Sequence, residues 1–308
     1  MKVLFAGTPQ LATKTLAGLL DSEHSVVGVL TRQDAPQGRK RQLTPSPLAS
    51  YAQDKGLPVI KANRWDSRVA QEISELGADI ASVVAYGTLL PPAALELLPH
   101  GWINLHFSDL PHWRGAAPVQ RALMAGAEYI HSCTFKIEPS LDTGPVFMTE
   151  KTAVAAEDTA GEILNRLATS GARLLAETIE AIARGQAGKP QQGEPSYAPK
   201  LTLADGRINW NHKASEILAR YRAVSPEPGP WCQLQEQKIK LGKLRLSQEK
   251  AAASPGTVEV KQQTCLVHCA DYCLELELVQ PAGKKMMKAA DWARGLGPEL
   301  KNKKVVLK

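Results

Sequence analysis

The chain opens with MKVLFAGTPQLATKTLAGLL (Met1–Leu20), and this stretch decides the fold. Val3–Ala6 is a short apolar run typical of a buried strand, and Gly7-Thr8-Pro9 ends it with a turn. Leu16 and Leu20 lie four residues apart and predict a helix directly after that turn. A strand followed at once by a helix is the unit of parallel sheets that are covered by helices.

The same alternation continues to about residue 185. Further strands are predicted at 25–30, 79–85, 102–106, 132–137 and 146–154, with helices at 69–76, 117–125 and 159–185. Thr159 and Glu162 form a capping box at the start of the last helix, and Gly185 ends it. We therefore expect an α/β domain over residues 1–188, with a doubly wound, mostly parallel sheet.

A second domain is expected after a linker. Residues 186–205 are rich in Pro, Gly and Gln without periodicity, so we place a linker at 189–205 and a C-terminal domain at 206–308. One helix near 214–221 is followed by predicted strands at 239–246, 256–260, 265–269 and 273–278. Short strands separated by turns predict a small β-barrel, and a five-stranded barrel that binds nucleic acid is compatible with them.

The charge is unevenly distributed along the 308 residues. Residues 206–308 contain 18 Lys and Arg against 10 Asp and Glu, and the first 205 residues contain 19 against 21. A near-neutral first part and a basic second part indicate that the second part meets a polyanion. The alternative is a lysine-rich solvated surface without a partner.

No stretch resembles a signal peptide or a membrane helix, because the first apolar run ends at Gly7. The five cysteines, an odd number, are expected to be reduced thiols in a cytoplasmic protein. Cys265, His268, Cys269 and Cys273 could suggest zinc, but their spacing fits no usual ligand pair, and the segment alternates like strands. We expect no metal, no membrane contact and a monomer.

The turn Gly7-Thr8-Pro9 stands where a nucleotide-binding loop would lie. It lacks the second and third glycines of the dinucleotide fingerprint, which bring the pyrophosphate against the backbone. The turn is therefore interpreted only as the entry into a helix.

The most informative stretch is INLHFSDLPHWRGAAP, residues 103–118. Asn104 and His106 lie two apart on the predicted strand, so their side chains leave the same face. They stand at the carboxyl end of that strand, the edge where open α/β sheets bind ligands. An amide and an imidazole at that edge suit acyl transfer, since Asn104 can donate to a developing oxyanion and His106 can donate likewise or move a proton.

Asp142 lies in the turn Leu141-Asp142-Thr143-Gly144, between two apolar runs. An Asp beside Thr-Gly is commonly only a turn former. If the turn folds over the same edge, the carboxylate would fix the tautomer of His106 and favour its cationic form.

Taken together, these motifs resemble the 10-formyltetrahydrofolate-dependent formyltransferases, over essentially the whole chain. The matching segments are FAGTP at 5–9, VAYG at 84–87, the Asn-x-His and RGAAP motifs of 103–118, LDTG at 141–144, APKL at 198–201, INW at 208–210 and QPAGKKM at 280–286. Within that family the chain is similar to the branch whose acceptor is methionyl initiator tRNA. The resemblance implies a formyltransferase-like Rossmann domain and an OB-like second domain.

The resemblance also assigns roles to residues. Asn104, His106 and Asp142 would be catalytic, and no metal is implied. The folate co-substrate, 10-formyltetrahydrofolate, would be held by two stretches: Val84, Ala85, Tyr86 and Gly87, and Ser108, Asp109, Leu110 and Pro111. Asp109 departs from the family pattern, which commonly has a second leucine there.

Basic residues are implied to bind the tRNA. Thr31–Pro47 is a basic loop that is too polar to pack, and it coincides with an insertion that in the family reaches the acceptor end. The candidate tRNA ligands are Arg39, Lys40, Arg41, Lys200 and Arg222. Two alternatives remain: a formyltransferase for another amine, such as an amino sugar on a nucleotide, or a non-catalytic RNA-binding protein on the same fold.

Overall fold

The computed structural model describes residues 1–38, 40–297, 300 and 305–308. Contacts divide the chain into two compact units. The first comprises Met1–Pro118, Tyr129–Ala153 and Ile163–Ala198, and the second comprises Val119–Glu128, Val154–Glu162 and Pro199–Lys308. The first unit thus includes most of the predicted linker, up to Ala198, and the second includes two short segments from earlier in the chain.

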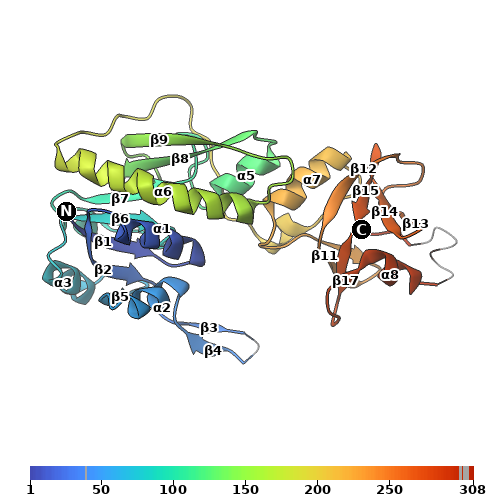
Figure 1. Cartoon of the computed structure of the whole chain (residues 1–308), viewed down its shortest axis with the longest axis horizontal. Coiled ribbons are helices and arrows are strands. Elements are labelled where there is room, and N and C mark those ends of the chain that lie inside the picture. Colours follow the sequence, from blue (N-terminus) through green and yellow to red (C-terminus); the bar gives the residue numbers. More distant parts are fainter. Residues whose placement is uncertain (39, 298–299, 301–304) are drawn as a thin grey trace. The chain divides into compact units, whose positions relative to one another are not determined.

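A seven-stranded sheet forms the centre of the first unit (Figure 1). Its spatial order is β5 (Val59–Lys61), β2 (Ser25–Thr31), β1 (Lys2–Gly7), β6 (Ile80–Val84), β7 (Trp102–His106), β8 (Tyr129–Lys136) and β9 (Val146–Ala153). The strands from β5 to β7 are parallel, and β8 and β9 are antiparallel to their neighbours. The predicted fold class, a mostly parallel doubly wound sheet, is confirmed.

Helices cover both faces of this sheet. On one face lie α1 (Gln10–Leu20), α2 (Pro47–Asp54) and the long α6 (Ala160–Ala183). Here α1 and α6 approach closely, because a Cβ added at Gly18 would lie 2.6 Å from Ala172 Cβ. The other face holds α3 (Ser67–Glu75) and α4 (Pro92–Leu95), and Trp102 is buried there and donates from Nε1 to Ala94 O at 2.7 Å.

Strand β7 shows how this arrangement positions the candidate catalytic residues. Leu105 faces α6, since a Cβ added at Gly171 of that helix would lie 2.4 Å from its side chain. Side chains alternate along a strand, so Asn104 and His106 share the opposite face with Trp102. The face of β7 toward α6 is thus filled by apolar packing, and Asn104 and His106 are directed to the opposite face.

The basic segment 31–47 has more structure than the sequence analysis predicted. Instead of an unpacked loop, it forms a two-stranded antiparallel hairpin from β3 (Ala35–Gln37) and β4 (Gln42–Thr44), with Ala35 opposite Thr44. Its strands are only three residues long and largely exposed, so no hydrophobic alternation marks them in the sequence. The prediction of an exposed loop was therefore right in position and wrong in conformation.

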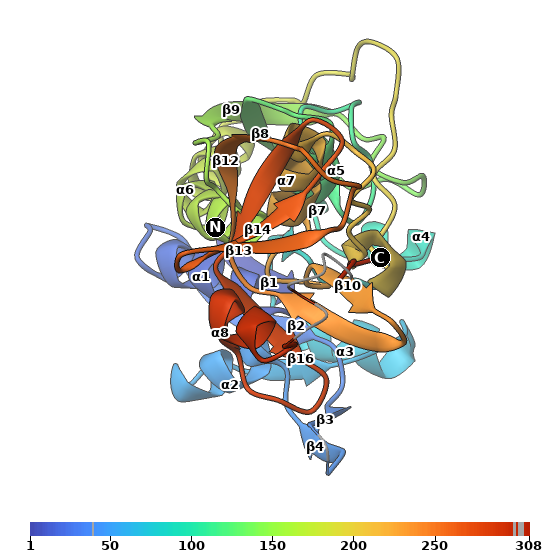
Figure 2. The same cartoon turned by 90° about the vertical axis from the view of Figure 1, so that its right-hand side faces the viewer.

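The second unit is an antiparallel β domain whose described residues form two four-stranded sheets (Figure 2). One has the order β10 (Trp231–Leu234), β11 (Gln237–Leu241), β16 (Leu278–Pro281), β17 (Met287–Lys288). The other has the order β12 (Leu244–Lys250), β15 (Tyr272–Leu276), β14 (Thr264–His268), β13 (Val258–Lys261). The unit also contains α5 (Pro118–Met124), a 3-10 turn at Leu203–Gly206, α7 (Ala214–Ala223) and α8 (Ala289–Arg294). The first residue of α5, Pro118, is assigned to the first unit.

The prediction of a single strand at 239–246 was wrong, because the chain forms two strands there, β11 and β12, that belong to different sheets. Gly242 lies at the break between β11 and β12, where an added Cβ would be 2.5 Å from Leu278 Cβ. The apolar pattern runs through the break without interruption, since Leu241 and Leu244 are both buried. Only the tight approach of the two backbones reveals that the chain changes sheets.

The cysteines of this unit are buried thiols on or beside strands, as the sequence analysis interpreted them. Burial raises the pKa of Cys265 and of Cys269 to about 12, so both stay protonated at neutral pH. Among the described residues, no helix has both the length and the apolar content required to cross a bilayer.

A candidate active site at the carboxyl end of strand β7

His106 is the last residue of β7, and its side chain is almost fully buried, with 6% of the residue exposed. Its Nε2 lies 3.1 Å from the carbonyl oxygen of Trp113. Because a carbonyl only accepts hydrogen bonds, Nε2 carries the proton and Nδ1 holds the free lone pair of the neutral ring. Burial lowers the pKa of His106, and the nearby charge of Asp142 opposes that shift. The ring is therefore neutral at pH 7.

Two residues of β8 stand beside Asn104 and His106 in the sheet. In register, Phe135 stands opposite Asn104 and Cys133 opposite His106. The ring of Phe135 meets the imidazole edge to face, with centroids 6.1 Å apart and planes at 86°. Burial raises the pKa of the Cys133 thiol to about 12, so it adds no charge beside His106. The apolar surroundings hold the imidazole in place and keep water from part of its surface.

The turn between β8 and β9 brings Asp142 to the same edge. Its Oδ2 accepts a hydrogen bond of 2.7 Å from the backbone N–H of Gly115, in the loop that follows β7. Asp142 itself has a positive φ of 51°, a conformation in which Asp is more common than most residues. The carboxylate is thus fixed on the loop beside His106, and its charge acts on the pKa of that ring.

Gly144 allows this turn to close. A Cβ at that position would lie 1.7 Å from the carbonyl oxygen of Lys136, so no other residue fits without moving the backbone. Asp142 and Gly144 also present their carbonyl oxygens to the Nε2 amide of Gln191, at 2.8 and 2.9 Å. Gln191 in turn accepts from Arg114 Nη2 at 2.6 Å.

The sequence analysis missed this role of Gln191. It placed the residue in a linker, because Gln191 stands in a Pro- and Gln-rich stretch without periodicity. A side chain that binds backbone carbonyls 47 and 49 residues away leaves no mark in such a pattern. Only the folded chain identifies it as a support of the Asp142 turn.

The first candidate folate stretch, Ser108–Pro111, forms a rigid corner after β7. Ser108 is buried and donates from Oγ to the carbonyl oxygen of His112 at 2.6 Å. Leu110 is buried beside Cys133 and Phe135. Asp109 is exposed, so its departure from the family pattern falls on a side chain that faces solvent.

The second candidate stretch follows β6, whose last paired residue is Val84. Ala85 and Gly87 have positive φ values of 50° and 77°, which turn the backbone away from the sheet. Tyr86 between them is buried and donates from its hydroxyl to the carbonyl oxygen of Ala62 at 3.0 Å. Peptide groups of residues 85–87 thus lie beyond the strand pairing, at the same sheet edge as His106.

The candidate tRNA ligands fall on separate elements. Lys40 and Arg41 are exposed at the turn of the β3–β4 hairpin, and Arg39 lies outside the described residues. Lys200 is exposed. Arg222 on α7 donates from Nη1 to the carbonyl oxygens of Ala155 and Ala156, at 3.4 and 2.9 Å, so its guanidinium already joins two segments of its own unit.

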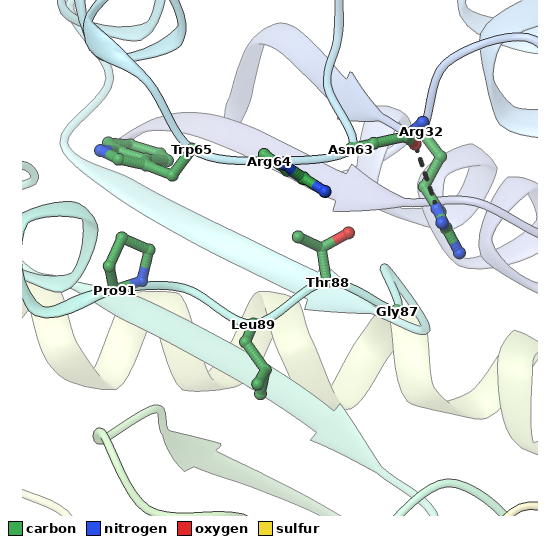
Figure 3. A pocket seen from close by; sticks show the side chains of 8 residues that line it. All are labelled: Arg32, Asn63, Arg64, Trp65, Gly87, Thr88, Leu89 and Pro91. Carbon is green, nitrogen blue, oxygen red and sulfur yellow. Dashed lines mark hydrogen bonds between the residues drawn. The ribbon is translucent and has the colours of Figure 1, made fainter.

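The structure also shows an open cleft of about 430 Å³ that the sequence analysis did not predict (Figure 3). It lies at the carboxyl ends of β2, β5 and β6 and includes Arg32, Arg64 and Gly87. The sequence analysis included Arg32 only in the basic segment 31–47. Arg64 follows β5, a strand of three residues that the sequence pattern did not reveal.

Comparison with known proteins identifies the family. Residues 1–179 match the model of the formyl transferase family, and residues 200–297 match its C-terminal domain. A methionyl-tRNA formyltransferase of Paenarthrobacter aurescens is 52% identical over 297 residues, which cover 96% of this chain and 97% of that protein.

Solved structures share the fold at low sequence identity. A methionyl-tRNA formyltransferase from Clostridium thermocellum has a TM-score of 0.57 at 13% identity, covering 80% of this chain and 94% of the other. HypX from Aquifex aeolicus, in complex with tetrahydrofolic acid, has a TM-score of 0.66 at 15% identity, covering 98% of this chain and 48% of that one. With family models that match both parts of its sequence and a full-length relative at 52% identity, the chain belongs to the formyl transferase family, among the methionyl-tRNA formyltransferases.

Proposed function

We propose that the protein transfers the formyl group of 10-formyltetrahydrofolate to the free amino group of methionine on initiator tRNA, the reaction that prepares the initiator for translation. Full-length relatives at about half identity carry the name of this activity. The observation on which the proposal rests is the set of polar groups at one sheet edge, where Asn104, His106 and the charge of Asp142 come together.

The residues at this edge fit a folate. A pterin is a flat ring with hydrogen-bond donors and acceptors along its rim, and the peptide groups of 85–87 lie beyond the β6 ladder, with two positive φ values. Buried Leu110 supplies an apolar surface on the neighbouring loop. The folate supplies the formyl group, which it carries on N10. Its pterin ring would be held by Val84–Gly87 and Ser108–Pro111.

The chemistry assigned to the protein is acyl transfer without a covalent enzyme intermediate. The neutral amine attacks the formyl carbon, a new C–N bond forms, and negative charge develops on the formyl oxygen. The amide N–H of Asn104 stabilises that oxyanion, and one such donor is typically worth about 3 kcal/mol of barrier. The bond from carbon to N10 then breaks, and the folate leaves.

His106 is assigned the proton transfer. Its Nε2–H is engaged by the carbonyl of Trp113, so Nδ1 is the basic atom of the neutral ring. The proton released by the attacking nitrogen passes to Nδ1, directly or through a water molecule, and is returned to the departing N10. Asp142 stabilises the imidazolium that exists between these two steps.

The basic parts of the molecule are assigned to the tRNA. Lys40 and Arg41 on the hairpin would contact phosphates near the acceptor end, and Lys200 and Arg222 would belong to the surface of a tRNA-binding domain at 206–308 and the linker before it. Phosphate contacts of this kind position a nucleic acid without reading its sequence. Both substrates place the reaction in the cytoplasm.

The test is formyl transfer by purified protein with 10-formyltetrahydrofolate and three acceptors: methionyl initiator tRNA, a nucleotide-linked amino sugar and glycinamide ribonucleotide. Formylation of the tRNA alone is expected, and transfer only to a small amine would overturn the assignment of the acceptor. The variant His106→Ala should bind the tRNA with unchanged affinity and lose transfer. An RNA-binding protein without catalysis would show no transfer even as wild type.

A further inference from the structure

The segment 189–198, on the yellow trace that follows α6 in Figure 1, makes hydrogen bonds with two loops of the candidate active site. Most of the segment is exposed, but the polar side chains of Gln191 and Ser196 are half-buried. The segment and both loops belong to the first unit. These two side chains are therefore the ones through which the segment can act on the site.

Ser196 holds the loop that follows β7 on both sides of Trp113. Its Oγ accepts a hydrogen bond from the backbone N–H of Trp113 at 2.9 Å, and its carbonyl oxygen accepts from the N–H of Arg114 at 2.8 Å. Its own N–H donates to the carbonyl oxygen of Pro111 at 3.2 Å. Of these three bonds, the one to the hydroxyl depends on the side chain, so a substitution can remove it alone.

Trp113 has a backbone conformation that a bulky residue rarely adopts. Its φ is 61°, in the left-handed region. Such a conformation persists where the surroundings hold it in place. Here it directs the carbonyl oxygen of Trp113 to Nε2 of His106, 3.1 Å away, while its N–H meets Ser196. The hydroxyl of Ser196 therefore stabilises the conformation that keeps the proton of the imidazole on Nε2.

Gln191 acts in a similar way on the turn that carries Asp142. Asp142 also has a left-handed φ, of 51°, and the Gln191 amide donates to its carbonyl oxygen at 2.8 Å and to that of Gly144 at 2.9 Å. The oxygen of the same amide accepts from Arg114 Nη2 at 2.6 Å. Gln191 thus joins the turn to the loop after β7, and the Asp142 carboxylate stays beside the ring.

We propose that Ser196 and Gln191 are positioning residues for the proton transfer: Ser196 keeps His106 in the tautomer whose Nδ1 is free, and Gln191 keeps the carboxylate of Asp142 beside the ring. Each acts through backbone groups of a neighbouring loop rather than on the substrate. The inference rests on the proposed function, since it needs Nδ1 of His106 to accept a proton. A ring with its proton on Nδ1 has no lone pair there, so the rate depends on the fraction of molecules in the right tautomer.

The first test compares Ser196→Ala with Ser196→Thr, which keeps a hydroxyl at the same place. NMR of the ring nitrogens of neutral His106, assigned by their absence in His106→Asn, reports the tautomer without any substrate. We expect the proton on Nε2 in wild type and in Ser196→Thr. In Ser196→Ala the proton should be divided between the two nitrogens, because the Trp113 carbonyl is no longer held toward Nε2.

Kinetics of the same variants connect the tautomer to the reaction. The kcat of Ser196→Ala should fall about tenfold, the effect of one lost hydrogen bond, and the KM for methionyl-tRNA should not change. Ser196→Thr should restore kcat. The control Ser74→Ala removes an exposed hydroxyl of α3 that donates to the carbonyl oxygen of Ala70, and it should behave as wild type.

The second test measures the pKa of His106 in Gln191→Ala. Among the described titratable groups around the ring, Asp142 on the β8–β9 turn acts on it as a charge, and the Cys133 thiol of β8 stays protonated. The pKa should fall, because the carboxylate that raises it is no longer held in place. In an Asp142→Asn background the same substitution should leave the pKa unchanged, since no charge remains to move. The exposed neighbour Gln192→Ala is the control and should keep the wild-type pKa.

The outcomes separate this inference from the proposed function. An unchanged tautomer in Ser196→Ala would overturn it even if kcat falls, because the hydroxyl would then act in another way. An equal shift of the pKa with and without the Asp142 charge would overturn the part played by Gln191. If Ser196→Ala melts early, Ser196→Thr and Ser196→Val, which have the same shape, repeat the comparison. A wild type with its proton on Nε2 that transfers no formyl group to any acceptor would sink the proposed function instead.

Discussion

The edge beside β7 and the β3–β4 hairpin are both polar and both belong to the first unit, yet they are built in opposite ways. At the edge, His106 and Ser108 are buried, and each of these side chains is tied to a backbone carbonyl. At the hairpin, Lys40 and Arg41 are exposed at the turn between two strands of three residues each.

The difference follows from what each region has to do. A group that stabilises charge in a transition state must be fixed before the reaction, in surroundings from which water is excluded. A cation that attracts phosphates acts over longer distances and tolerates motion, and added salt weakens it. Substitutions at the edge are therefore expected to change kcat, and substitutions at the hairpin are expected to change binding and its dependence on salt.

After the loss of transfer expected for His106→Ala, the largest effect is expected from Asn104→Ala. Loss of the single amide donor to the oxyanion should lower kcat by roughly 10² to 10³, with no change in the Kd for methionyl-tRNA. Steady-state kinetics and a filter-binding measurement check the two halves of this expectation. The matched control is Asn165→Ala, an exposed position of α6, which should behave as wild type.

A kcat for Asn104→Ala within a factor of three of wild type would contradict the role of the amide. A large rise in the Kd for tRNA would instead show that the edge also serves binding, and the contrast between the two regions would then disappear.

A smaller effect is expected from Lys40→Ala/Arg41→Ala on the hairpin. The Kd for methionyl-tRNA should rise, and the slope of log K against log salt should become shallower by about two, one for each phosphate contact that is lost. Lys14→Ala/Arg184→Ala removes the same charge from exposed positions, one on α1 and one directly after α6, and should leave the slope as in wild type. An unchanged slope in the hairpin variant would mean that these cations meet no phosphate.

The smallest effect is a shift in the titration of His106. Burial lowers its pKa and the charge of Asp142 raises it, so Asp142→Asn should lower the pKa further from its ordinary value. The acidic limb of the pH dependence of kcat then moves toward lower pH, because the ring stays neutral over a wider range. NMR titration of the ring proton measures this directly, with the resonance assigned by its absence in His106→Asn. A pKa that rises in Asp142→Asn would show that the carboxylate does not act on this ring as a nearby charge.

Much of the fold could be predicted because it depends on patterns that repeat locally. The strand at Trp102–His106 and the helix at Ala160–Ala183 agree with the predicted ranges to within two residues. The capping box also forms, since Glu162 Oε2 accepts from the backbone N–H of Thr159 at 2.8 Å. Short elements escaped prediction, among them β5 and the hairpin strands, because three residues are too few to show a period.

The candidate site divides in the same way. Asn104 and His106 could be paired from the sequence, since two residues on one strand share a face by the geometry of the chain alone. Whether Asp142 reaches this edge could be stated from the sequence only as a condition. The hydrogen bond that fixes it joins Asp142 to Gly115, 27 residues away in the chain. The hydrogen bonds of Gln191 and the meeting of Arg32 and Arg64 at one cleft gave no signal in the sequence.

By itself, the sequence determined the order of strands and helices, the face that Asn104 and His106 share, and the motifs that reveal the family, because each depends on residues close together in the chain. The tertiary structure alone decided that His106 is neutral and bonded through Nε2 to Trp113, that Gly144 must lack a side chain, and that Arg32 and Arg64 face one cleft. Burial, steric exclusion and the pairing of charges depend on which distant segments become neighbours, and that is fixed only when the sheet assembles.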